Sequence, residues 1–176
     1  MKEKEGWNLF FRYFTLLIFG MGNLKIFYLI FTPLTVYPVL WLLKLLDANT
    51  SLLEGNLLFF EGIYAQIISA CVAGAAYYLM LILNLSTPMK KEQRIASVLF
   101  LFITFLVINI LRIFVFVLLA VSGFYYFDLV HKFVWYFGST VMLVAIWFVN
   151  VWKFKINSIP IYNDFREIFR DMTKRK

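Results

Sequence analysis

The sequence predicts an all-α polytopic membrane protein with about four transmembrane helices, interfacial helices near both ends and a small outer β-hairpin. Of its 176 residues, 62% are hydrophobic and 20% are aromatic, and the mean hydropathy of +0.81 is far above that of soluble domains. Several mostly apolar runs reach about 18 residues or more, enough to cross about 30 Å of hydrocarbon. We expect one membrane-embedded domain over residues 1–176, with a core at about 26–153.

The distribution of basic residues orients these runs. The chain has 17 Lys and Arg residues and a net charge of +7, and all but Lys44, Arg112 and Lys132 lie near the N-terminus, at 90–94 or after Trp152. Basic residues of short loops remain on the cytoplasmic side of a membrane. We therefore expect these three regions to be cytoplasmic in a multi-pass protein of the cell membrane, and we interpret the charge as topology and lipid contact, with no nucleic-acid partner.

The first half of the chain predicts an interfacial helix, one span and a hairpin. Residues 7–19 are aromatic and too short for a full span, which favours a helix at the cytoplasmic surface. Residues 26–46 form the first span, and Pro33 and Pro38 within it predict a kink. After a loop at 48–51, two short strands at 57–60 and 63–68 flank a tight turn and predict the outer hairpin.

Three further spans follow. A helix over 69–85 carries the only cysteine and has small residues at its outer end, which allow close packing of helices. After the basic loop, the third span covers 95–121, and a connection at 124–130 leads to the fourth span from about 131 to 152. Residues 157–176 predict an amphipathic cytoplasmic helix.

Three unusual residues are expected at one depth. Arg112 keeps its charge inside an apolar run, which costs several kcal/mol unless polar groups face it. Cys71, Arg112 and His131 lie 19, 18 and 22 residues from the nearest cytoplasmic basic residue. At about 1.5 Å per helical residue, these counts place them roughly 28, 27 and 33 Å from the cytoplasmic side.

Together, these residue types form a chemical unit for acyl transfer. A cysteine attacks as the thiolate, which a nearby cation favours. His131 can move the proton from the nucleophile to the leaving amine, and Arg112 can stabilise the thiolate, bind an oxyanion or hold a substrate carboxylate. Asn109, one turn before Arg112, and Asp128 are supporting candidates, and the set requires no metal or cofactor.

Each residue also has a simpler interpretation. Because Cys71 is the only cysteine of the sequence, an internal disulfide is excluded, and the residue could simply be a small buried hydrophobic side chain. His131 fits an interfacial cap, and Asn109 could bind a neighbouring carbonyl. Arg112 could pair with Asp128 or extend outward as a topology anchor.

Three segments in order carry a family resemblance. They are IISAC at 67–71, NILRI at 109–113 and FDLVH at 127–131, with Gly138 beyond. In this order and spacing the chain resembles the exosortase and archaeosortase family of polytopic membrane cysteine transpeptidases, over about 26–153. The chain departs from the family pattern after the cysteine, where Val72-Ala73 replaces a frequent Ser-Gly pair.

The resemblance implies a substrate, a reaction and roles for residues. The family's Cys, Arg and His fall on Cys71, Arg112 and His131. The expected partner is an exported protein whose C-terminal sorting signal has a short motif, a hydrophobic span and a basic end. The cysteine would cleave in the motif at the extracytoplasmic side and form a thioester, which passes to an acceptor, expected to be a membrane lipid.

Two alternatives stay open at this point. One is a non-enzymatic small membrane carrier or assembly subunit, in which Arg112 and His131 line a polar path and the thiol is dispensable. The other is a family member that only hydrolyses its substrate, with water as the acceptor.

Overall fold

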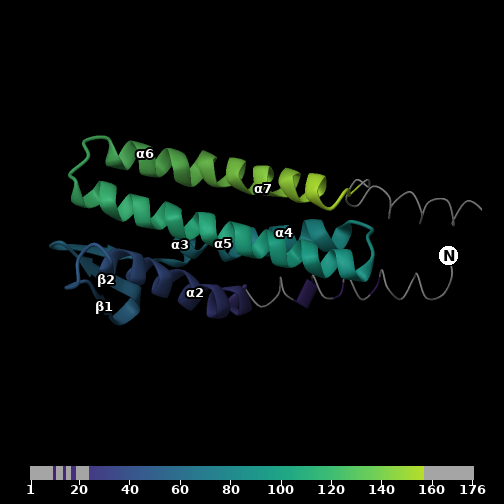
Figure 1. The fold of residues 1–176 in the computed structure, drawn as a ribbon, viewed down its shortest axis with the longest axis horizontal. Coiled ribbons are helices and arrows are strands. Elements are labelled where there is room, and N and C mark those ends of the chain that lie inside the picture. Colours follow the sequence, from purple (N-terminus) through teal and green to yellow (C-terminus); the bar gives the residue numbers. More distant parts are fainter. Residues whose placement is uncertain (1–9, 11–13, 15–16, 19–23, 157–176) are drawn as a thin grey trace, which may run out of the picture.

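The computed structural model describes residues 24–156 together with Phe10, Phe14, Leu17 and Ile18 (Figure 1). Those four N-terminal residues are helical. Apart from them, the helices expected at 7–19 and 157–176 lie outside the described residues.

Within the described part, four helical segments are long and apolar enough to cross a membrane. They are α2 (Lys25–Lys44), α3 with α4 (Ser69–Val72 and Gly74–Ser86), α5 (Lys91–Val121), and α6, η2 and α7 in succession (Phe127–Phe133, Val134–Gly138 and Ser139–Lys153). The α2 helix continues through Pro33 and Pro38. The third and fourth segments each begin four residues before the predicted position, because a helix continues into charged or interfacial residues beyond its apolar run.

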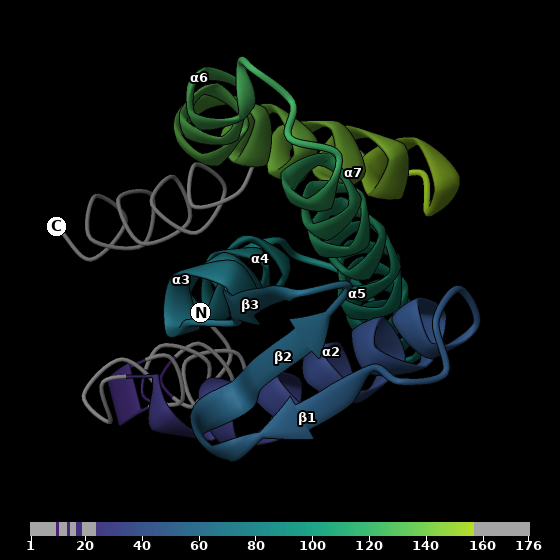
Figure 2. The same ribbon diagram turned by 90° about the vertical axis from the view of Figure 1, so that its left-hand side faces the viewer.

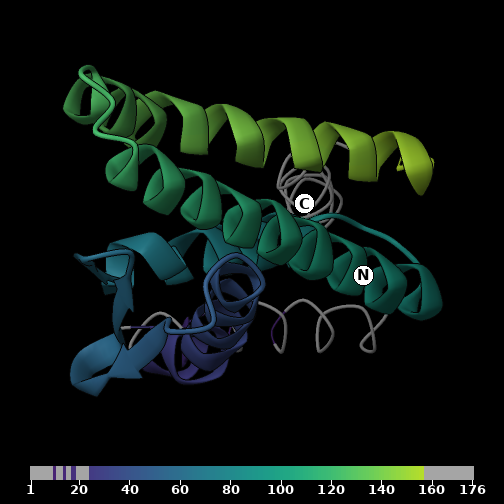
Figure 3. The same ribbon diagram turned by 60° about the vertical axis from the view of Figure 1, so that its left-hand side comes forward.

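The α5 helix is the centre of the bundle and packs against α2, α4 and α7 (Figures 1 and 3). An aromatic cluster joins three of these helices. The rings of Phe31 on α2 and Tyr77 on α4 stack with centroids 3.6 Å apart. Phe105 on α5 meets Tyr77 edge-on at 4.9 Å. Because aromatic pairs have preferred geometries, such contacts help to fix how these helices pack.

A three-stranded antiparallel sheet lies at one end of the bundle, in the order β1 (Ser51–Leu53), β2 (Leu57–Phe60), β3 (Ile63–Gln66) (Figure 2). The predicted hairpin is present as β2 and β3. Its two turn residues, Glu61 and Gly62, have φ values of 43° and 82°, as a type I′ hairpin turn requires. The sequence did not predict β1, which pairs with β2 after a single 3₁₀ turn (η1, Glu54–Asn56).

The helix predicted at 69–85 is broken near its start. Ala73 has a φ of 58°, in the left-handed region, and separates α3 from α4. Immediately after it, Gly74 lets α4 approach α2 closely, because a Cβ at this position would lie 2.8 Å from the Cε1 atom of Tyr28. Cys71 therefore sits on a single helical turn whose direction differs from that of the helix that follows.

At the other end of the bundle, three fully buried polar residues link α4, α5 and α7. Asn84 Nδ2 donates to Ser97 Oγ at 2.7 Å, and Ser97 Oγ donates to Asn150 Oδ1 at 2.9 Å. All three side chains have 0% exposure. We call them the polar clamp, and the sequence interpretation overlooked them. Interhelical hydrogen bonds of this kind fix the register of helices whose surfaces are otherwise uniformly apolar.

Candidate functional site

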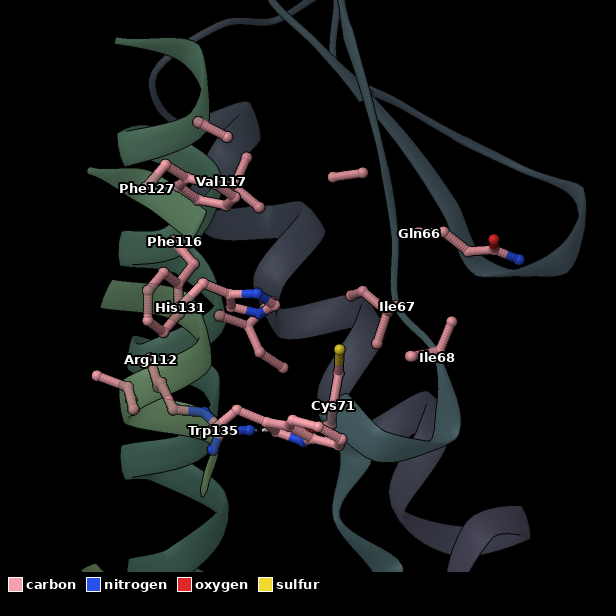
Figure 4. Close-up of a pocket in the computed structure, with 14 residues that line it drawn as sticks. Gln66, Ile67, Ile68, Cys71, Arg112, Phe116, Val117, Phe127, His131 and Trp135 are labelled. Carbon is pink, nitrogen blue, oxygen red and sulfur yellow. Dashed lines mark hydrogen bonds between the residues drawn. The ribbon is translucent and has the colours of Figure 1, made fainter. Parts of the chain in front are cut away.

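A cavity of about 240 Å³ lies at the end of the bundle that carries the sheet. Its walls come from β3 and the segment after it, α3, α5, α6 and η2 (Figure 4). Cys71, Arg112 and His131 all line this cavity. These three residues come from three different helical segments. The structure thus brings together the residues that the counts of helical residues had predicted at one depth.

Cys71 presents its thiol to the cavity while its backbone is held from behind. The side chain is half-buried, and its sulfur points into the cavity (Figure 4). Its carbonyl oxygen accepts hydrogen bonds from Asn109 Nδ2 at 2.9 Å and Arg112 Nη2 at 3.4 Å. Because the helix changes direction at Ala73, two side chains of α5 satisfy this carbonyl.

Arg112 has neutral polar partners. Its Nη1 donates to Ser139 Oγ at 2.5 Å, and Ser139 Oγ in turn donates to the Val134 carbonyl at 3.1 Å. With the Cys71 carbonyl, these partners account for how the charge is accommodated in an apolar helix. A guanidinium has five N–H donors, so the two hydrogen bonds leave donors available for an oxyanion or a carboxylate in the cavity.

His131 is held by aromatic rings. Its ring stacks on Phe127 with centroids 5.6 Å apart and meets Phe116 edge-on at 5.0 Å. The side chain is exposed. Among the described residues, no hydrogen bond joins its ring nitrogens to a protein group. The ring nitrogens are therefore available to a polar group that enters the cavity.

The two supporting candidates lie in different environments. Asn109 is completely buried, and its side-chain Nδ2 bonds the backbone carbonyl of Cys71. The Asn109 Oδ1 atom has no hydrogen-bond partner among the described residues. Asp128 is exposed on α6, and the residues that line the cavity do not include it. Arg112 is bonded to Ser139 and Cys71, and the alternative pairing with Asp128 is not formed.

Sequence reasoning missed several residues of this site. Ser139 holds Arg112, and Trp135, Phe116 and Gln66 line the cavity. Ser139 follows Gly138 inside an apolar span, and a polar residue at such a position is a signal that could have identified it. The aromatic residues carried no such signal, because aromatic side chains are abundant throughout the chain.

The described fold is thus a helical bundle, with four segments able to cross a membrane and a cavity that contains a cysteine, an arginine and a histidine. No family model matches the chain, and neither a curated protein nor a solved structure matches it. The function is therefore inferred from the chemistry of the cavity and from the sequence segments that line it.

Proposed function

We propose that this chain is a membrane cysteine protease and transpeptidase that cleaves a C-terminal sorting signal of exported proteins and transfers them to a lipid. One observation carries the proposal. The only cysteine and the only histidine of the sequence line one cavity with an arginine from the middle of an apolar helix. Three residues without a shared role would not be expected to meet in one cavity.

In the proposed topology, the four apolar segments cross the membrane and the cavity opens at the extracytoplasmic side. The basic residues at 90–94 lie at the junction of α4 and α5, at the opposite end of the bundle from the sheet (Figure 1). Positive residues favour the cytoplasmic side. This charge distribution supports an outward-facing cavity, where an exported protein would arrive.

The proposed reaction begins with attack by the Cys71 sulfur on the carbonyl carbon of the scissile peptide bond. The thiol proton passes to His131, and N–H donors of Arg112 stabilise the oxyanion of the tetrahedral intermediate. When the C–N bond breaks, His131 returns the proton to the leaving amine, and the exported protein remains as a thioester on Cys71. A hydroxyl or amino group of a lipid headgroup then attacks the thioester, loses its proton to His131 and releases the cysteine, which is reprotonated.

The resemblance to exosortases and archaeosortases supports this reaction. The backbone next to the nucleophile adds a further point. The family pattern often has glycine two residues after the cysteine, and the corresponding Ala73 has a φ of 58°. Glycine adopts this conformation without strain. Ala73 thus differs from the family's usual glycine in residue type, but its backbone has a conformation that suits glycine.

The proposal is tested by co-expression with exported proteins encoded beside this gene that end in a shared motif, a hydrophobic span and basic residues. We expect the wild-type chain to shorten such a protein, and Cys71→Ala and Cys71→Ser to leave it at full length while still inserting into membranes. Mass spectrometry of the new C-terminus distinguishes a lipid adduct from a free carboxylate. Normal processing by Cys71→Ala would refute the proposal and favour a non-enzymatic membrane protein.

A further inference from the structure

We infer that the free edge of β3 binds the substrate segment that precedes the scissile bond, as an added strand running parallel to β3. The identity of this segment rests on the proposed function. The binding mode itself rests on the geometry of the sheet and the cavity, and it assigns a peptide-binding role to a surface outside the Cys-Arg-His set.

Within the described part of the chain, the outer edge of β3 has backbone N–H and C=O groups without a hydrogen-bond partner. In the sheet, β3 pairs with β2 alone. The Ile67 amide donates to the Asn56 carbonyl at 3.1 Å, so the odd-numbered residues of this segment direct their backbone groups toward the β2 side. In an antiparallel ladder the direction alternates. The N–H and C=O groups of Tyr64 and Gln66 therefore point to the free edge, where no described strand lies beside them.

This edge leads directly to the nucleophile. The chain continues from Gln66 through Ile67 and Ile68 into α3, and all three residues line the same cavity as Cys71 (Figure 4). The sheet places β3 on the side of α3 and α6, with β1 on the opposite side (Figure 2). A peptide that extends the sheet at β3 would thus enter the cavity, whereas one at the β1 edge would not.

The length of the edge and its surroundings define the ligand. At about 3.3 Å per residue, the distance from Tyr64 to Ile68 accommodates roughly four extended residues. The opposite wall includes Phe116 and Trp135, so alternate side chains of the bound segment face aromatic surface. Such pairing takes affinity from main-chain hydrogen bonds and specificity from pockets for alternate side chains. The expected ligand is a short, extended motif without proline at the residues that pair with the edge.

The direction of the bound strand follows from the direction of β3, which runs toward Cys71. A parallel peptide brings its own C-terminal end to the thiol. In the proposed substrate, the motif precedes the hydrophobic span, so the residues before the cleaved bond would lie along β3 and the span would continue beyond Cys71.

A peptide that alkylates Cys71 tests this binding mode in the full-length chain in lipid nanodiscs. The probe is acetyl-tetraalanyl chloromethyl ketone, and the reference is the chloromethyl ketone of acetyl-alanine. Each reacts with the thiol to form a bond from sulfur to carbon and releases chloride and a proton. Because a chloromethyl ketone can also alkylate His131, which lines the same cavity, loss of the mass shift in Cys71→Ala assigns the adduct to Cys71. We expect the longer probe to react at least about tenfold faster, because it gains several backbone hydrogen bonds.

N-methylation of the probe provides a matched control. Moved along the peptide, a single N-methyl group should slow alkylation at alternate positions and have little effect at the positions between them. Gln66→Pro, which removes an N–H at the free edge, should abolish the length effect, while Gln66→Ala should retain it. If Gln66→Pro does not fold, the N-methyl series on the wild-type chain decides.

The outcomes separate the two proposals. Equal rates for both probes, or no alternation in the N-methyl series, would overturn strand addition even if Cys71-dependent processing occurs. A length effect with two-residue alternation, together with no Cys71-dependent processing, would support strand addition and refute the transpeptidase.

Discussion

Replacing Ser97 with alanine should destabilise the bundle, although the change removes a single oxygen atom. Ser97 is completely buried, and its hydroxyl is the middle member of the polar clamp. The substitution breaks both hydrogen bonds of the clamp at once. It also removes these partners of Asn84 Nδ2 and Asn150 Oδ1. The other polar atoms of the two amides, Asn84 Oδ1 and Asn150 Nδ2, already have no hydrogen-bond partner in the described part of the chain.

The magnitude follows from these contacts. Interhelical hydrogen bonds in membranes contribute about 0.6 kcal/mol on average and about 1.7 kcal/mol at most. A buried amide group left without a partner costs about 1–3 kcal/mol. Because Asn150 Oδ1 loses its hydroxyl partner and Asn84 Nδ2 keeps only a contact of 4.0 Å with Met89 Sδ, we expect Ser97→Ala to lower the free energy of unfolding by about 1–3 kcal/mol.

The measurement is unfolding by SDS in mixed micelles, followed by tryptophan fluorescence. The matched control is Ser122→Ala, because Ser122 is exposed and its hydroxyl bonds only the Leu119 carbonyl of its own helix. This control should change the free energy of unfolding by at most about 0.5 kcal/mol. Equal effects of the two substitutions would refute the energetic role of the clamp.

A triple variant tests the reasoning further. Combining Asn84→Leu, Ser97→Ala and Asn150→Leu replaces all three polar groups with apolar ones, so no polar side-chain group of the clamp remains buried without a partner. Replacing both partners of a buried hydrogen bond can be nearly neutral. We therefore expect the triple variant to be more stable than Ser97→Ala alone, and a less stable triple variant would contradict the argument.

Three further predictions concern the site and its support. Arg112→Lys should lower Cys71-dependent processing at least about tenfold, because an ammonium cannot reproduce the planar fork that binds two acceptors; processing at the wild-type rate would leave Arg112 only an anchoring role. Ala73→Gly should leave the free energy of unfolding unchanged or raise it by up to about 1 kcal/mol, because glycine adopts a left-handed backbone without strain. The control Ala75→Gly, in the regular helix α4, should lower it by about 0.5–1 kcal/mol. SDS unfolding measures both variants, and equal losses would contradict the strain at Ala73. Gly62→Ala should destabilise the hairpin by about 1–2 kcal/mol because its φ is 82°, and unchanged hydrogen exchange in β2 and β3 would disprove this.

The helical segments could be predicted from the sequence because each contains a long apolar run. Their ends were less accurate. The α5 helix begins at Lys91, where the charged first turn is not apolar, and the fourth segment begins at Phe127 among aromatic residues that resemble an interfacial connection. Hydropathy marks the residues that can lie in lipid, and a helix can extend beyond them.

The irregular features could not be predicted in this way. The left-handed backbone at Ala73 cannot be read from the residue type, since alanine is a strong helix former. The strand at Ser51–Leu53 is too short to show alternation. The hairpin was predictable because Glu61-Gly62 separates two apolar runs and has glycine where a positive φ is needed.

Counting residues from the basic loops predicted that Cys71, Arg112 and His131 lie at a similar depth, because helical rise converts sequence distance into height. It could not predict which face of each helix they occupy or which atoms meet. Arg112 bonds the carbonyl of Cys71, and Ser139 is its second partner. Such contacts depend on the rotation of each helix about its axis, which uniformly apolar surfaces leave undetermined.

The π-helical segment η2 (Val134–Gly138) has a consequence for that rotation. A π-helical turn typically adds one residue to an otherwise α-helical path, and one residue corresponds to a rotation of about 100°. His131 lies before this segment, while Ser139 and Asn150, which tie the same span to α5, lie after it. The extra residue thus rotates the part of the span before η2 about the helix axis relative to the part after it. The imidazole of His131 therefore faces the cavity, while Ser139 and Asn150 face α5. Shortening the span by one residue within 134–138 would turn His131 out of the cavity without breaking either contact with α5.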